Sequence, residues 1–363
     1  MKKILLGTTA AIAMGTLSTE AFAADKIKLE LGGFMRQYVG FSNSDEVAAT
    51  ANTIADRDTG IGQQGNTEIY FTGSTTLDNG LKVSVTMEME ANREATTNMD
   101  ESYLTVSSNE MGALTMGADV HAGDDMAVRA PIAGNHDWGD LVDWVGSATT
   151  AGGNSTATTD TAGDITDWGD DTIKVKYMSP SFAGVTVGAS WSAAEGNNIE
   201  DGQLITNNRR DGYTMGIAYA GDFDGIGVDA SLIHGRVSAT HDQTHLGLAV
   251  NVAGVTVGGS YMDFDGVPTT GANTDSTDGK AWELGVGYET GPYSLSATYV
   301  NSENKGTSTA GDNEDTKWQI NATYDMGSGV ALTAAYFDQS QDAEGATASV
   351  DTNGLIAGIE VSF

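Results

Sequence analysis

Charged side chains are unevenly distributed along this sequence, and their arrangement suits the attraction and sorting of ions. Residues 120–170 contain nine aspartates but a single arginine, Arg129. Basic residues lie before and after this acidic stretch, in segments where charged and apolar residues alternate or at the end of such a segment. They are Arg36, Lys82, Arg93, Lys174, Lys176 and Lys317. Rings of charge in a confined aqueous passage set which ions enter.

Other chemistries find little support in the sequence. Ser, His and Asp residues form no recognisable pattern of nucleophile and base, which argues against an enzyme. The glycines over 60–65 match a dinucleotide motif but precede a strand, where such a site needs a helix. His234, His241 and His245 fall near one hairpin, which favours a surface cluster over a zinc site. The net charge of −33 argues against nucleic acid as a partner, and the absence of cysteine excludes disulfides.

The segments that would position the charges are short, and their apolar residues recur at every second position. This period predicts strands with one apolar face. In residues 27–41, Leu29, Leu31 and Met35 share one face, while Arg36 and Tyr38 share the other. We count sixteen such segments, at approximately 27–41, 66–77, 81–92, 101–108, 113–119, 171–178, 185–192, 212–219, 226–234, 244–251, 255–264, 281–288, 293–300, 316–324, 330–337 and 353–363.

The connections between these segments alternate in length. Tight turns, such as 78–80, 109–112, 179–184 and 325–329, join one set of ends, and longer polar loops join the other. No stretch approaches the roughly 18 apolar residues of a spanning helix. Short turns opposite long loops and an even strand number are typical of barrels in outer membranes. The sequence therefore predicts an all-β fold, a sixteen-stranded antiparallel transmembrane β-barrel.

Aromatic residues recur near both ends of the rows that would face outward. Toward the loop ends lie Trp191, Tyr213, Tyr261, Trp282, Tyr299, Trp318 and Tyr336. Toward the turn ends lie Tyr177, Tyr219, Tyr288, Tyr293, Tyr324 and Phe363. Amphipathic rings at two levels are what the two interfaces of a bilayer favour. We therefore expect these side chains to lie at the membrane interfaces.

The start of the chain has the pattern of an export signal. Two lysines precede an apolar run over 4–17, and residues 21–23 read Ala-Phe-Ala, the small residues of a cleavage site. Glycines and threonines interrupt the run, which is too short to span a bilayer. We therefore expect residues 1–23 to be a cleaved signal peptide and 24–363 to be the barrel domain.

The acidic stretch, over about 119–170, has no convincing strand, and a segment of that length in a compact domain requires a function. Its apolar residues, such as Trp138 and Leu141, would be exposed to water unless the segment packs against other parts of the protein. We therefore expect this loop to fold into the barrel and narrow the passage. The acids expected at the constriction are Asp124, Asp125, Asp137, Asp140 and Asp143. Any single one of these charged residues could instead be an ordinary solvated side chain. The whole sequence contains 50 acidic residues against 17 basic ones, and this excess predicts cation selectivity.

Taken together, these features resemble a general porin of Gram-negative bacteria, of the alphaproteobacterial, Rhodobacter-like type. The export signal, the sixteen strands, the long third loop and a terminal strand that ends on Phe363 carry the resemblance over essentially the whole mature chain. Two local patterns add to it, Gly-Asp-Asp-Met at 123–126 and Ser-Pro-Ser-Phe-Ala-Gly at 179–184. The low-complexity stretch 152–159 departs from the family and leaves the role of the aspartates over 160–170 open.

The resemblance implies a water-filled channel for passive diffusion of ions and small hydrophilic solutes across the outer membrane. It also implies a homotrimer in contact with outer-membrane lipid, in which the third loop lines the narrowest point of each pore. Phe363 would be read by the machinery that inserts barrels. No cofactor is required, although the acidic loops would suit Ca²⁺. A substrate-specific channel is the main alternative, and a structural or adhesive surface barrel is a further one.

Overall fold

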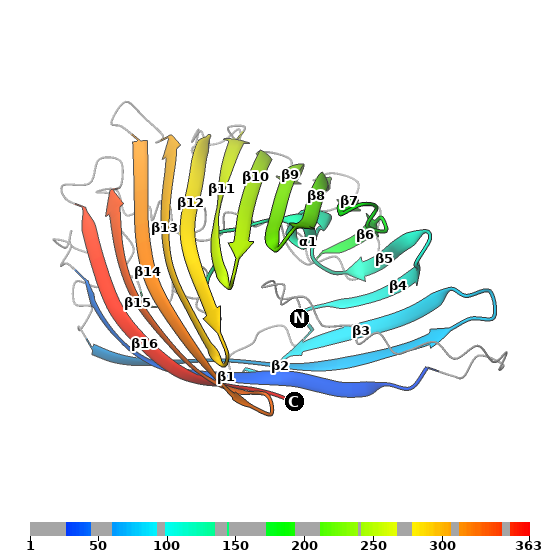
Figure 1. Cartoon of the computed structure of the whole chain (residues 1–363), viewed down its shortest axis with the longest axis horizontal. Helices are drawn as coiled ribbons and strands as arrows, with labels where there is room; N and C mark the ends of the chain where they lie inside the picture. The colour runs from blue at the N-terminus through cyan, green and yellow to red at the C-terminus, as the bar shows by residue number, and fades with distance from the viewer. Residues whose placement is uncertain are drawn as a thin grey trace, which may run out of the picture.

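Sixteen antiparallel strands close into a barrel in the computed structural model (Figure 1). The structure describes residues 27–44, 60–92, 99–134, 144, 172–192, 211–238, 241–266, 278–305, 312–342 and 349–363. The expected signal peptide lies outside these residues, as do Arg93, Asp137, Asp140 and Asp143. In the described part of the chain, no helix is long and apolar enough to cross a membrane. The strand number and the antiparallel barrel predicted from the sequence are confirmed.

Every strand pairs with its neighbours in the chain, and β1 pairs with β16 to complete the ring. The elements are β1 (Glu30–Ser44), β2 (Gly60–Thr76), β3 (Lys82–Glu90), β4 (Ser102–Ser108), β5 (Gly112–Ala118), α1 (Ala122–Met126), β6 (Ile173–Met178), β7 (Val185–Ser192), β8 (Gly212–Phe223), β9 (Ile226–Ser238), β10 (His241–Val252), β11 (Val255–Gly266), β12 (Gly279–Thr290), β13 (Tyr293–Lys305), β14 (Asp312–Gly327), β15 (Val330–Asp342) and β16 (Val350–Ser362). Closure leaves the sheet without an exposed edge.

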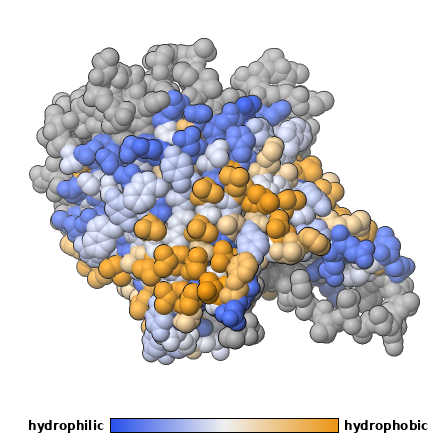
Figure 2. All heavy atoms as spheres, turned by 45° about the horizontal axis from the view of Figure 1, so that its top comes forward, coloured by the Kyte–Doolittle hydropathy of each residue, from blue (hydrophilic) through white to orange (hydrophobic). Residues whose placement is uncertain are grey.

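Alternation along each strand separates an apolar outer face from an inner one. On β1, Leu31 and Met35 are exposed, whereas Tyr38 is buried inside the ring. On β16, Leu355 is exposed and its neighbour Ile356 is fully buried. Figure 2 shows the result on one side of the molecule, an apolar band with hydrophilic residues above it. The facing of both terminal strands agrees with the period of two in the sequence.

The tight turns have a backbone that matches the twist of the strands they join. Ala253 and Gly254 both have positive φ, 51° and 85°, and the turns at 183–184, 224–225 and 328–329 share this pattern. Two successive residues with positive φ mark the type I′ turn, which suits right-handed strand twist. Glycine at the second position adopts this conformation without strain. The predicted turns are thus confirmed as tight connections.

Several strands extend further toward the loop ends than their apolar alternation predicts. β9 reaches Ser238 and β14 begins at Asp312, each four residues beyond the predicted limit. Backbone pairing continues through polar residues such as Glu314 and Gln341. The apolar alternation ends before the strand does, because it marks only the part of the strand whose outer face is apolar.

The strand lengths also divide the ring into two parts. Strands β3 to β6 contain only six to nine residues. Strands β8 to β16 contain twelve to sixteen. We call the part of the barrel formed by the short strands β3 to β6 its low side and the part formed by β8 to β16 its high side.

Candidate functional site

The described start of the third loop, residues 119–134, lies along the inner wall. Figure 1 shows α1 inside the ring, beside β7 and β8. Backbone N–H groups of the segment donate to inward-facing oxygens on β7, β8, β9, β12 and β13. These bonds join Ala122 to Ser190 Oγ (3.1 Å), Gly123 to Thr214 Oγ1 (3.0 Å), Val128 to Ser231 Oγ (3.0 Å), Ala130 to Glu283 Oε1 (2.7 Å) and Ala133 to Ser296 Oγ (2.9 Å). An irregular segment needs such partners when it is buried, and here the wall supplies them.

Inward-facing glycines make room for this segment. A Cβ at Gly258 would lie 3.1 Å from the carbonyl oxygen of Arg129, and one at Gly247 would overlap the carbonyl oxygen of Val128. On β12, a Cβ at Gly287 would lie 3.0 Å from Pro131. A side chain at these positions would push the segment away from the wall, because backbone atoms cannot move aside as a flexible side chain can. The wall is therefore shaped to receive the loop.

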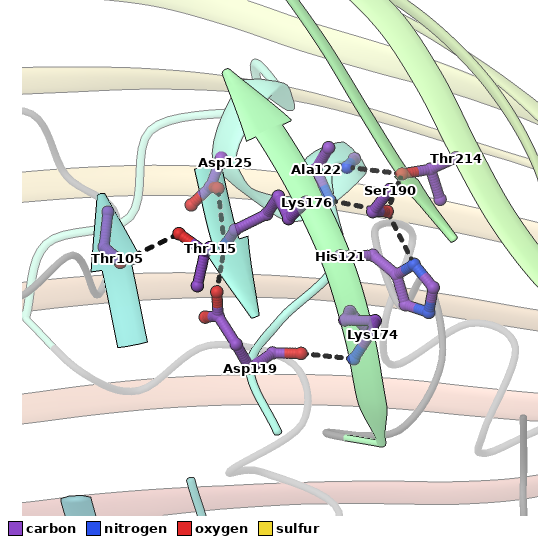
Figure 3. Close-up of polar contacts among 11 residues, drawn as sticks. Thr105, Thr115, Asp119, His121, Ala122, Asp125, Lys174, Lys176, Ser190 and Thr214 are labelled. Carbon is purple, nitrogen blue, oxygen red and sulfur yellow. Dashed lines mark hydrogen bonds and ion pairs between the residues drawn. The ribbon is translucent and has the colours of Figure 1, made fainter. Parts of the chain in front are cut away.

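A buried group of ion pairs holds the base of the loop, between β5, α1 and β6. Lys176 Nζ lies 2.7 Å from Asp119 Oδ2 and 2.9 Å from Asp125 Oδ2. Figure 3 shows the Lys176 side chain between the two carboxylates. Lys174 Nζ donates to the carbonyl oxygen of Asp119. Burial raises the pKa of the Asp119 carboxyl, and the nearby lysines, Lys176 above all, oppose that rise. Of the predicted pore residues, Lys176 and Asp125 thus form an ion pair, and Lys174 bonds the backbone of Asp119 beside them.

A hydrogen-bonded trio beside these ion pairs fixes the start of α1. His121 is fully buried, and its Nδ1 lies 2.8 Å from Ser190 Oγ. Ser190 Oγ lies 2.8 Å from Thr214 Oγ1, so the imidazole is tied to both β7 and β8 (Figure 3). Sequence reasoning did not single out His121. A lone histidine outside a strand carries no spacing signal.

A second charged group lies on the wall of β2 and β3. Carboxylate oxygens of Glu68, Glu90 and Asp100 all lie within 4.8 Å of one another, and Glu68 and Glu90 are register partners. Tyr70 donates its hydroxyl to Glu68 Oε2 over 2.7 Å. Burial raises the pKa of Asp100, which precedes β4. Within the described part of the chain, this acid cluster is the group with ligand atoms spaced to hold a metal ion.

Sequence reasoning missed the acid cluster, although a signal for it is present. The run Met87-Glu88-Met89-Glu90 alternates apolar and acidic residues. Because the outer face of a barrel strand is apolar, both glutamates must face inward. The constriction acids predicted from the sequence lie in the loop instead.

The ring order places the acid cluster and the loop segment on opposite sides. β3 and β11 are eight strands apart in a ring of sixteen. The cluster stands on β2 and β3, while residues 128–133 lie along β9 to β13. The lumen therefore lies between an acidic wall and the loop.

The remaining predicted constriction residues are spread over the wall. The Arg36 guanidinium lies 3.9 Å from the centroid of the Phe34 ring on β1. Lys317 Nζ lies 3.7 Å from Asp315 Oδ2 on β14, and both side chains are buried. Lys82 begins β3 at its turn end, and Asp124 lies in the first turn of α1. Of these four, Arg36 and Lys82 stand on strands at the acid cluster: Arg36 on β1, which pairs with β2, and Lys82 at the turn end of β3.

The predicted interface aromatics face outward, and most of them lie on β7 to β16. Trp191 pairs in register with Tyr213, and the rings of Trp282 and Tyr299 are tilted by 39° with centroids 5.1 Å apart. Trp318 and Tyr336 form a similar pair. Near the turn ends, the centroids of Tyr293 and Tyr324 are 5.0 Å apart. Of the remaining rings of the set, Tyr261 of β11 pairs in register with Trp282, and Tyr177, Tyr219, Tyr288 and Phe363 lie near the turn ends of β6, β8, β12 and β16.

Comparison with solved structures finds the same architecture. The trimer form of OmpT, an outer membrane protein of Vibrio cholerae, matches with a TM-score of 0.60 and 14% identity, over 93% of this chain and 100% of that chain. A triple mutant of the Rhodopseudomonas blastica porin matches with a TM-score of 0.57 and 16% identity, over 93% and 100%. The outer membrane channel DcaP of Acinetobacter baumannii matches with a TM-score of 0.63 and 13% identity, over 94% of this chain and 98% of that chain. At these identities the likeness concerns the fold.

Comparison at the level of sequence identifies the family. No curated protein matches the chain. The sequence profile of Gram-negative porins matches residues 7–344, which is most of the sequence. Fold and profile agree, and the chain therefore belongs to the Gram-negative porin family.

Proposed function

We propose that this protein is a cation-selective diffusion channel whose third loop narrows the lumen. As a Gram-negative porin, it is an outer-membrane channel for passive diffusion and not an enzyme. The observation that carries the proposed selectivity is the acid cluster of Glu68, Glu90 and Asp100 on the wall opposite the loop. The turn over 179–184 and the start of the loop over 123–126 support the alphaproteobacterial type.

The balance of uncompensated charge supports cations as the preferred ions. At the base of the loop, Lys176 pairs with the carboxylates of Asp119 and Asp125, and Lys174 donates to the carbonyl oxygen of Asp119, so the formal charges of the two lysines and two aspartates balance. Lys317 likewise has Asp315 beside it. The acid cluster has Arg36 as its nearby base, which leaves net negative charge on that wall. In a confined passage such a wall raises the local concentration of cations.

Neutralising the acid cluster should therefore weaken the preference for cations. We expect the parent channel to prefer K⁺ over Cl⁻, and Glu68→Gln with Glu90→Gln and Asp100→Asn to lower the permeability ratio by about threefold or more, since a charge at ~4 Å in water contributes ~1 kcal/mol. Reversal potentials in a salt gradient across planar bilayers measure this ratio. Asp263→Asn with Asp265→Asn, on the outer face, is the control.

Two results would count against this assignment. Anion preference in the parent would refute the proposed selectivity itself. An unchanged ratio in the triple variant would show that the acid cluster does not set it. The outer-face variant is expected to keep the parental ratio, because its charges lie outside the passage.

We also propose a homotrimer in which the low side of the barrel faces neighbouring copies. A strand of 7 residues, such as β4, rises about 18 Å along a barrel axis when tilted by ~40°, which is less than the ~25 Å apolar band. A strand of 12 residues, such as β12, rises about 30 Å. The outward aromatic pairs also lie on β7 to β15 and not on β3 to β5. A solved relative, OmpT, has a trimer form.

An arginine on the low side should disrupt the trimer. Thr105 and Thr115 bond each other on the inner face, so Leu104 of β4 faces outward. We expect Leu104→Arg to convert trimers to monomers on unheated gels, because an unpaired guanidinium would be buried between subunits. Leu284→Arg, on the exposed outer face of β12, is the control and should leave trimers. Equal effects of the two variants would contradict the proposed interface, as would parental conductance steps that never occur in threes.

A further inference from the structure

The inner wall has an apolar patch far from the base of the third loop. Tyr38 of β1, Val300 of β13, Phe337 of β15 and Ile356 of β16 are buried on the inner face, each no more than 3% exposed. Inward side chains of a channel barrel are polar, because the lumen holds water. An apolar patch on this face therefore needs a cover.

Trp144, from the third loop, packs on this patch. Trp144 is 7% exposed and forms one buried apolar cluster with the four residues, against which Ile132 packs. The indole N–H donates to Gln64 Oε1 of β2 over 2.7 Å. A buried indole needs such an acceptor, and the amide supplies it at the edge of the patch.

The wall is also shaped to receive the indole ring. Gly40 of β1 and Gly62 of β2 are register partners, and both lie under Trp144. A Cβ at Gly62 would lie 2.9 Å from ring atom Cζ3, and one at Gly40 would lie 2.8 Å from Cη2 and overlap Cζ3. Neither glycine has positive φ, so turn geometry does not explain them. Together these two glycines form a slot for the ring.

We propose that Trp144 in this slot is a second anchor of the third loop and holds the width of the constriction. Backbone amides attach residues 122–133 to the wall from β7 to β13, and Trp144 attaches the chain to β1 and β2. A loop fixed at two distant points of the ring has a defined position, whereas one fixed at a single end can swing. Trp144 is thus a positioning residue. The inference rests on the proposed narrowing of the lumen by the loop.

Conductance and current noise of single channels test the anchor. We expect Trp144→Ala to raise mean conductance by about 1.5-fold or more and to increase open-channel noise, because the loop gains freedom. Trp144→Phe keeps an aromatic ring in the slot and should stay near the parental values. Gly62→Val, with Trp144 intact, should reproduce the effect of Trp144→Ala. Gln64→Leu removes the acceptor at similar volume and should increase noise more than conductance.

The control and a folding check make the outcome decisive. Trp318→Ala removes an outward-facing indole and should leave conductance unchanged. Each barrel is confirmed as folded by its faster migration on unheated gels, and Gly62→Ala replaces Gly62→Val if the larger side chain prevents folding. Parental conductance and noise in folded Trp144→Ala would overturn the anchor. If deletion of residues 134–162 still raised conductance, the proposed constriction would stand without it. If the deletion also left conductance unchanged, both the anchor and the proposed constriction by the third loop would be wrong.

Discussion

Deleting residues 134–162 is expected to raise single-channel conductance several-fold. A ring of sixteen strands encloses a channel too wide for fine selection. The described start of the third loop already occupies the inner wall from β7 to β13. Removing the rest of the loop would leave the lumen limited by the wall alone. Planar bilayer recordings in symmetric salt measure the change.

A matched deletion separates the third loop from loops in general. Removing residues 195–208, between β7 and β8, shortens another connection and should leave conductance near the parental value. Solute size provides a second readout, because liposomes with the third-loop deletion should admit larger sugars. If the deletion left both conductance and the size limit unchanged, the third loop would not be the constriction.

Replacing Lys176 with methionine should cause the largest loss of stability. The side chains of Lys176 and Asp119 are only 8% and 6% exposed, and Asp125 shares the same ammonium. Methionine leaves two carboxylates close together without their main partner. Breaking a buried pair in this way costs about 3–5 kcal/mol. We therefore expect Lys176→Met to lower the free energy of unfolding by that amount, as measured by urea titration in lipid vesicles.

An exposed ion pair on the outer surface provides the control for this prediction. Lys280 Nζ lies 3.0 Å from Glu303 Oε2, and the two side chains are 48% and 41% exposed. Solvent screens such a pair, so Lys280→Met should cost no more than about 1 kcal/mol. Adding Asp119→Asn to Lys176→Met should recover part of the loss, because one uncompensated charge disappears. Equal losses from the two lysine variants would show that the buried ion pairs do not stabilise the fold.

The barrel itself follows from local features of the sequence. Alternation at every second residue fixes which side chains face outward, as at Leu355 and Ile356. Glycine and its neighbours set the tight turns, as at Ala253 and Gly254. Both signals act within a few residues, so one sequence suffices to reveal them. Strand ends were underestimated, because backbone pairing continues through polar residues such as Glu314 that carry no apolar period.

The candidate site depended on contacts between distant parts of the chain. Alternation correctly placed Lys174 and Lys176 on the inner face. It could not show that Lys174 donates to the carbonyl oxygen of Asp119 or that Lys176 pairs with the Asp119 carboxylate. Register across β2 and β3 brings Glu68 beside Glu90. The slot for Trp144 depends in the same way on the pairing of Gly40 with Gly62. The sequence by itself determined the barrel and the facing of its strands, because period and turn chemistry are local. Only the tertiary structure decided which charges cancel, which stay uncompensated and where the loop is held, because register and ring closure join residues that are far apart in the chain.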